Sequence, residues 1–193
     1  LGSQLSQAGF TIVSGLAIGV DAISHKSALE NGNKTIAVLG CGVDCCSPTE
    51  NINLYNQIIK SQSTIVSELP LSHPPTKGSF PARNRIIAGL SLGVLVTEGG
   101  EDSGSLITAD YAFKNNRKVF AVPGPITSSL SKGPYKLIQK GAKLVTDTKD
   151  IINDLGFKNY DLPAGRQGLR IKNTQRRAKG DTKEEEKILE ILV

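Results

Sequence analysis

The loop at residues 71–84 carries the side chains best suited to holding a nucleic acid. It contains Lys77, Gly78, Ser79, Phe80 and Arg83. Basic side chains neutralise phosphates, small residues expose backbone amides, and a phenyl ring offers a stacking face to a base. These residue types suit a surface that binds phosphates and a base. The alternative is a surface loop whose Phe80 packs into the core and whose basic residues are only solvated.

A second candidate is the glycine and serine turn that reads EGGEDSGSLITAD. The hydroxyl groups of Ser103, Ser105 and Thr108 surround the start of a helix that we expect over 101–116. Free amides and the helix dipole both favour anions at such a position, so the turn predicts a phosphate cradle. It lacks the GxxxxGK[ST] pattern of a Walker motif, and a serine there is also an ordinary N-cap.

Residues for catalysis or metal binding form no recognisable pattern. Cys41, Cys45 and Cys46 share one loop, without the two spaced pairs that a zinc site requires, and only His25 and His73 could assist them. No carboxylate pair and no Ser/His/Asp order is evident. We therefore predict no catalytic residue, no metal and no cofactor, and interpret the cysteines as reduced, half-buried thiols.

The net charge of +5 is unevenly distributed. Residues 1–155 carry 14 basic and 12 acidic groups, so the remainder of the chain supplies most of the excess. No acidic residue lies between Glu68 and Glu98, whereas Lys77, Arg83 and Arg85 do. This local positive charge favours an anionic ligand. Arg85 can equally pair with Glu68 or Glu98.

Short β-branched runs alternate with helical patterns along the chain, which has 193 residues and 38% hydrophobic residues. Such alternation predicts a doubly wound α/β fold with a mostly parallel sheet, whose ligands lie beyond the carboxyl ends of the strands. No apolar run is long enough to span a membrane, and the expected compartment is the cytoplasm. We expect strands at 10–15, 34–42, 63–70, 92–100 and 117–124, a short sixth strand before 147, and helices at 16–32, 51–62, 83–91, 101–116 and 147–156.

Several collinear segments resemble the DNA-processing protein A (DprA/Smf) family from about residue 10 to residue 147. They are SGLAIGVDAISHKSAL, TIAVLGCGVD, GSFPARNRIIAGLS, GVLVTEGGEDSGSLITADYA and VFAVPGPI. The resemblance implies an extended Rossmann-like fold that binds single-stranded DNA, forms a homodimer and loads the RecA recombinase during natural transformation, without enzymatic chemistry.

The resemblance also implies where the strand lies. The DNA-binding residues that it implies are Lys77, Gly78, Ser79, Phe80, Arg83 and Asn84. A second rank is expected to line the same pocket because ligands meet the carboxyl ends of the strands: Ser14, Gly15, Ser103, Gly104 and Ser105. Asn84 is expected to contact a base edge or to cap the following helix. A further glycine-rich turn of the family is expected upstream of residue 1, where its arginine would complete the pocket.

The domain organisation predicted from this pattern has three parts. Residues 1–156 form the Rossmann-like DNA-binding domain, and 157–180 form a polar, basic linker. Residues 181–193 have an N-cap, a glutamate-rich first turn and an apolar stripe, so they are expected to be the first helix of a winged-helix domain.

Two other classes of function remain as alternatives. The Gly-Gly turn is similar to that of nucleotide phosphoribohydrolases with a PGGxGTxxE motif, although the sequence here lacks the glutamate in its place. The second alternative is a module that only docks a protein partner.

Overall fold

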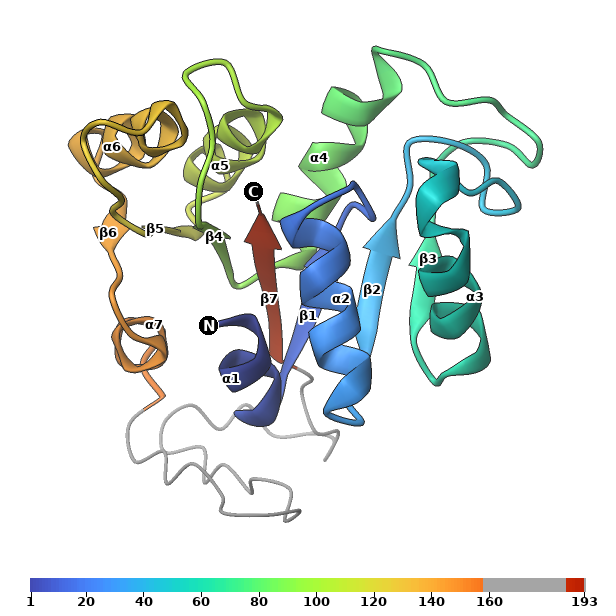
Figure 1. Ribbon diagram of the computed structural model, residues 1–193, viewed down its shortest axis with the longest axis horizontal. Helices are drawn as coiled ribbons and strands as arrows, with labels where there is room; N and C mark the ends of the chain where they lie inside the picture. Colours follow the sequence, from blue (N-terminus) through green and yellow to red (C-terminus); the bar gives the residue numbers. More distant parts are fainter. Residues whose placement is uncertain (158–186, 193) are drawn as a thin grey trace, which may run out of the picture.

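The structure, a computed structural model, describes residues 1–157 and 187–192 of the chain. Its seven strands form one parallel sheet in the order β3-β2-β1-β7-β4-β5-β6, as Figure 1 shows. The strands are β1 (Phe10–Ser14), β2 (Thr35–Val38), β3 (Thr64–Val66), β4 (Gly93–Val96), β5 (Lys118–Ala121), β6 (Lys143–Leu144) and β7 (Lys187–Leu192). The predicted fold class is confirmed.

Helices cover both faces of the sheet. They are α1 (Gly2–Gln7), α2 (Val20–Glu30), α3 (Ile52–Lys60), α4 (Ser79–Leu90), α5 (Gly104–Lys114), α6 (Lys132–Gln139) and α7 (Thr148–Asp154). Helices α1, α2, α3 and α7 pack on one face, and α4, α5 and α6 pack on the other. The central strands β1 and β4 are covered on both sides, so all of their residues are buried.

The two halves of the core follow the alternation of side chains along each strand. Ile12 and Leu95 point to the face that carries α1, α2 and α7, whereas Val13 and Val96 point to the face that carries α4 and α5. All four are fully buried. The α4 and α5 face is lined largely by alanine and valine, so these helices approach the sheet closely.

The C-terminal segment differs from its prediction. Residues 187–192 form a strand, β7, and not the helix expected there. The strand lies between β1 and β4 and pairs with both, for example Ile12 with Leu189 and Leu95 with Ile191. Two flanking strands offer main-chain donors and acceptors to an extended segment, and this pairing overrides local helical preference. The predicted linker lies outside the described residues, except for Phe157.

Helix α4 also begins earlier than predicted. It starts at Ser79, so Ser79, Phe80, Arg83 and Asn84 lie on the helix and not in the preceding loop. Pro81 falls in the first helical turn, where its missing N–H would have no partner, and it therefore does not disturb the helix. Within the described residues, no helix is long and apolar enough to cross a membrane.

Candidate nucleic-acid interface

The predicted residues lie at the carboxyl ends of the strands, along the upper rim of the molecule in Figure 1. Ser14 and Gly15 end β1, the loop at Gly40 follows β2, and the turn before α5 follows β4. Helix α4 packs against β1, β2 and α5, so its first turns stand between these loops. The structure therefore brings both predicted groups, the one near residue 80 and the one near residue 103, to one edge of the sheet.

Arg83 is the most enclosed member of the site. Its side chain is 7% exposed, and Nη1 donates to the main-chain carbonyl of Gly15 at 2.7 Å and to that of Val38. Its Nε donates to the side-chain oxygen of Asn84 at 3.0 Å. These contacts join α4 to the ends of β1 and β2. Arg83 therefore stabilises the positions of these strand ends. The contact of Arg83 with a DNA phosphate remains a prediction.

Gly15 is required by this arrangement. A Cβ atom at Gly15 would lie 2.1 Å from Nη2 of Arg83, so no larger residue fits beside the buried guanidinium. The amide of Gly15 donates to Oδ2 of Asp21 at 2.9 Å, and the amide of Ala17 donates to the same oxygen at 3.2 Å. Between them, Leu16 adopts a φ of 59°, a conformation that non-glycine residues rarely adopt. Asp21 thus fixes a strained turn.

Phe80 lies at the surface of the site. Its side chain is 36% exposed, and its ring rests on the loop after β2, where a Cβ atom at Gly40 would lie 2.9 Å from Cδ1. Ser79 anchors the same turn, because its Oγ donates to the carbonyl of Gly40 at 2.5 Å and accepts from the amide of Thr76 at 3.0 Å. The ring is held in place and still offers surface for stacking on a base.

Lys77 and Gly78 precede α4 and are exposed. Two neighbouring basic residues are already engaged, since Arg85 forms an ion pair with Glu68 and Arg83 is buried. The pairing of Arg85 with Glu68 decides between the two partners considered from the sequence. Of the three basic residues between Glu68 and Glu98, Lys77 is therefore the one placed to meet a phosphate from solvent.

Asn84 joins α4 to the start of α5. Its side chain is buried, accepts from Arg83 and donates through Nδ2 to the carbonyl of Gly104 at 3.2 Å. The suggestion that Asn84 caps the helix is wrong, because α4 begins at Ser79. A contact between Asn84 and a base edge stays a prediction.

The turn before α5 is closed by its own hydroxyl groups. Ser103 is the N-cap, and its Oγ accepts from the amide of Ser105 at 3.3 Å and lies 2.8 Å from the hydroxyl of Ser105. Ser105 is buried, whereas Gly104 is exposed. The N-cap interpretation is confirmed for Ser103, and the phosphate cradle remains a prediction. Ser14, at the end of β1, is fully buried.

His25 joins α2 to the first residue of β2 inside the core. Its side chain is fully buried, and its Nδ1 lies 2.6 Å from the hydroxyl of Thr35. The hydroxyl of Thr35 donates its proton to the carbonyl of Ile12 at 2.7 Å, so it accepts the hydrogen bond from Nδ1 of His25. Burial lowers the pKa of His25 from 6.5 to about 4, against the opposing attraction of Asp21. The imidazole is therefore neutral near pH 7.

Sequence reasoning missed Gly40, Asp21 and Gly133 as parts of this region. Asp21 is an acidic residue in the first turn of α2, and its spacing of six residues from Gly15 allows it to close the intervening turn. Gly133 lies so close to the turn before α5 that its Cβ atom would be 2.6 Å from the carbonyl oxygen of Gly99. No local sequence pattern predicts such close approaches between segments that are far apart in the chain.

The three cysteines are free thiols beside the site. Cys41 is buried and donates to the carbonyl of Cys45 at 3.3 Å, and burial raises the pKa of the Cys41 and Cys46 thiols. Raised pKa values disfavour the reactive thiolate. Within residues 1–157, no group of three or more His, Cys, Asp or Glu side chains is arranged to hold a metal ion.

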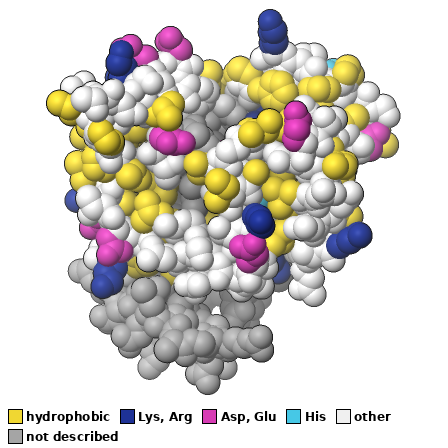
Figure 2. Space-filling model, viewed as in Figure 1, with side chains coloured by type: hydrophobic (Ala, Val, Ile, Leu, Met, Phe, Trp, Pro, Cys, Tyr) yellow, Lys and Arg dark blue, Asp and Glu magenta, His cyan; other side chains and the backbone are white. Residues whose placement is uncertain are grey.

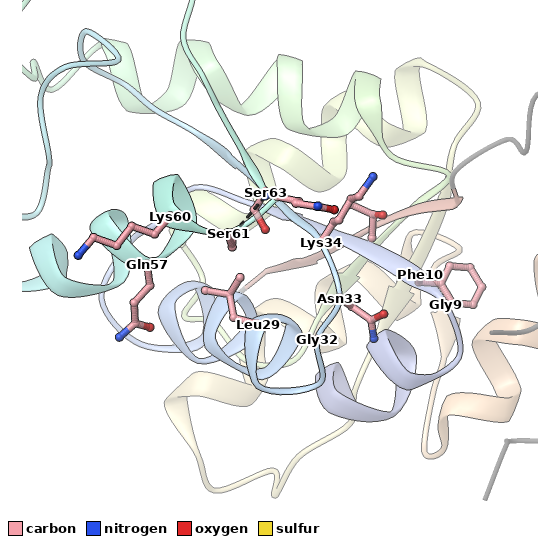
Figure 3. A pocket seen from close by; sticks show the side chains of 12 residues that line it. Gly9, Phe10, Leu29, Gly32, Asn33, Lys34, Gln57, Lys60, Ser61 and Ser63 are labelled. Atoms are coloured by element: carbon pink, nitrogen blue, oxygen red, sulfur yellow. Dashed lines mark hydrogen bonds between the residues drawn. The ribbon is translucent and has the colours of Figure 1, made fainter. Parts of the chain in front are cut away.

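A hollow of about 730 Å³ opens at the opposite end of the sheet (Figure 3). It lies at the amino ends of β1, β2 and β3, and its polar lining includes Asn33, Lys34, Lys60 and Ser63. Helices α2 and α3 end beside it, and helix C-termini carry partial negative charge. Because ligands of parallel α/β sheets bind beyond the carboxyl ends, this hollow does not compete with the rim as the candidate site.

The family described as DNA recombination-mediator protein A matches residues 1–156. The chain is 46% identical to protein Smf of Escherichia coli (strain K12) over 82% of this chain and 42% of that protein. It is 49% identical to DNA processing protein DprA of Streptococcus pneumoniae over 76% of this chain and 51% of that protein. The chain thus spans about half the length of these curated relatives.

Two solved structures agree with the fold. A crystal structure of DNA processing protein A from Streptococcus pneumoniae superposes with a TM-score of 0.73 and 47% identity, covering 79% of this chain and 53% of that one. A structure of DNA processing protein A from Helicobacter pylori, which concerns the single-stranded DNA binding mode of that protein, superposes with a TM-score of 0.71 and 35% identity. It covers 80% of this chain and 70% of that one.

Proposed function

The chain belongs to the DNA recombination-mediator protein A family, and from this membership and the geometry of the rim we propose that it binds single-stranded DNA. The observation that carries the proposal is the pairing of an exposed, anchored ring at Phe80 with an exposed cation at Lys77. Both stand beside the loops that end β1 and β2. Stacking and phosphate neutralisation are the two contacts that nonspecific single-strand binding requires.

The buried residues give this surface a fixed floor. Arg83 holds the carbonyl groups of Gly15 and Val38, and Asn84 holds that of Gly104. A strand that lies over Phe80 would therefore meet loops whose main chain is already ordered, which lowers the entropic cost of binding. Under this proposal, Ser103, Gly104 and Ser105 form the far side of the same surface.

The wider role that we propose is that of a recombination mediator without enzymatic chemistry. The protein would protect incoming single-stranded DNA and load the RecA recombinase onto it during natural transformation, acting as a homodimer in the cytoplasm. Membership of the family and the 46 and 49% identity to protein Smf and DNA processing protein DprA support this proposal.

Titration of the purified chain with fluorescent oligo-dT at two salt concentrations tests the binding proposal. We expect affinity to fall as salt rises, because phosphate contacts release condensed cations. Nucleotide turnover is measured on the same sample, and no release of a free base from AMP is expected. Cleavage of AMP without strand binding would instead support the phosphoribohydrolase alternative.

A further inference from the structure

We propose that Lys132 and Lys136 of α6 form a second contact region for the same DNA strand, an inference that rests on the proposed function. The ligand at this region would be the sugar-phosphate backbone, held by charge and without base recognition. The first contact region is the surface at Lys77 and Phe80. A strand that reaches both regions must be longer than one that reaches only the first.

The start of α6 and the residues just before it form main-chain hydrogen bonds with the turn that precedes α5. The amide of Gly133 donates to the carbonyl of Gly99 at 2.9 Å, and the amide of Gly99 donates to the carbonyl of Leu130 at 2.7 Å. Figure 1 shows α4, α5 and α6 standing along the same upper rim, and α5 packs against both of its neighbours. Lys132 and Lys136 therefore lie on the far side of the Ser103 turn from Phe80.

The stretch of sequence that contains α6 is basic, although Glu101 and Asp110 from outside this stretch pair with three of its lysines. No acidic residue occurs from 111 to 146, and this stretch carries Lys114, Arg117, Lys118, Lys132, Lys136, Lys140 and Lys143. Lys118, at the opposite end of the sheet, is paired with Asp154 at 3.1 Å. Lys132 and Lys136 stand one helical turn apart on α6, and their side chains are 59% and 51% exposed. Like-charged groups in this arrangement match a run of phosphates.

A single carboxylate, that of Glu101, now lies between the two lysines. Its oxygens are 3.8 Å from Nζ of Lys132 and 3.2 Å from Nζ of Lys136. The two lysines lower the pKa of Glu101, so the carboxylate stays charged and neutralises them only in part. Exposed ion pairs contribute little net stability. A phosphate can therefore replace Glu101 at small cost, and Glu101 occupies the position that the phosphate would take.

Figure 2 is consistent with this arrangement, because acidic and basic side chains stand together at the top left of the view, over α6 and the turn before α5. Further pairs of an acidic and a basic side chain stand at the lower left and near the centre of this face. The region therefore has the character of a small charged cluster beside the first contact region.

The test compares a short oligo-dT of about 6 nucleotides with a long one of about 20, by fluorescence anisotropy over a range of salt concentrations. The double variant Lys132→Ala/Lys136→Ala should bind the long strand several-fold more weakly. Its plot of log affinity against log salt should become shallower by about 1.4 in slope, because two phosphate contacts are lost. Binding of the short strand should not change. Glu101→Gln should strengthen binding of the long strand.

The matched control is Lys26→Ala/Lys118→Ala, which also removes two exposed lysines that pair with acids, away from the rim. It should keep the wild-type slope for both strands. Thermal unfolding of each variant shows that the fold is kept. If Lys132→Ala/Lys136→Ala binds the long strand with the affinity and salt slope of the wild type, this inference is overturned and the proposed function is not. Absence of binding by the wild type to either strand would overturn the proposed function itself.

Discussion

Arg83 and Lys77 are six residues apart in the sequence but have opposite surroundings. Arg83 is buried and donates to main-chain carbonyl groups, whereas Lys77 is exposed just before α4. The same contrast separates buried Asn84 from Phe80, whose ring is partly exposed. We call Arg83 and Asn84 the inner group, and Lys77 and Phe80 the outer group. The inner group gives the rim its shape, and the outer group meets solvent and, under our proposal, the strand.

This comparison predicts that changes in the inner group reduce stability, whereas changes in the outer group reduce binding and leave stability nearly unchanged.

Replacing Arg83 with alanine should cost about 3 kcal/mol of unfolding free energy, because the carbonyl groups of Gly15 and Val38 lose a buried donor. The matched control is Arg85→Ala, which breaks an exposed ion pair with Glu68 and should cost less than about 1 kcal/mol. Urea unfolding of both variants measures the difference. Equal losses would contradict the division into inner and outer groups.

Acid should lower the stability of the fold through His25, a buried residue outside the inner group. Its pKa is about 4 when folded, below the ordinary 6.5, so the folded state binds fewer protons than the unfolded state. The resulting stability is complete above pH 6.5 and is lost as pH falls towards 4. The unfolding free energy should drop by about 2 kcal/mol between pH 7 and pH 5.

His25→Gln provides the control, because glutamine does not titrate in this range. Unfolding of this variant in urea should depend less on pH between 7 and 5 than that of the wild type. The Asp44 and Asp150 carboxyl groups have lowered pKa values and act only at lower pH. An equal slope in both proteins would show that another group governs the effect.

Replacing Phe80 with alanine should weaken oligo-dT binding by about 1 to 3 kcal/mol, through loss of the stacking face. Phe80→Leu keeps an apolar side chain over Gly40 but has no flat ring, so it should bind nearly as weakly as Phe80→Ala. Anisotropy titration measures both. Wild-type affinity in Phe80→Leu would mean that the ring acts only by packing.

Replacing Lys77 with alanine should have the smallest effect at moderate salt. The plot of log affinity against log salt should become shallower by about 0.7 in slope, which is the contribution of one phosphate contact on a single strand. Lys26→Ala removes an equally exposed lysine from α2 and serves as the control. The two variants should have the same melting temperature. Identical slopes would exclude Lys77 from the contact with DNA.

The order of strands and helices could be read from the sequence because each parallel strand is a short apolar run between helical patterns. The sequence also predicted that the candidate residues gather at the carboxyl ends of the strands, and the structure brings them together there. Two expectations were wrong for physical reasons. Residues 79–82 were expected to lie in a loop, but Pro81 fits the first turn of α4, and residues 187–192 have helical spacing but pair as β7.

The roles within the site were harder to predict. A basic residue near a proposed DNA surface is expected to meet phosphate, yet Arg83 turns inward to the carbonyl groups that end β1 and β2. Its partners lie 68 and 45 residues away in the chain, so no local pattern could indicate them. The same holds for Gly40 under Phe80 and for Gly133 against Gly99.

The sequence by itself determined the fold class, and it predicted the end of the sheet at which we place the candidate site and the residue types gathered there. Hydrophobic periodicity and residue chemistry are local properties, so they can be read directly along the chain. Only the tertiary structure decided which of those residues are buried supports and which are exposed contacts. That division depends on distances between segments remote in sequence, and it separates Arg83 and Asn84 from Lys77 and Phe80.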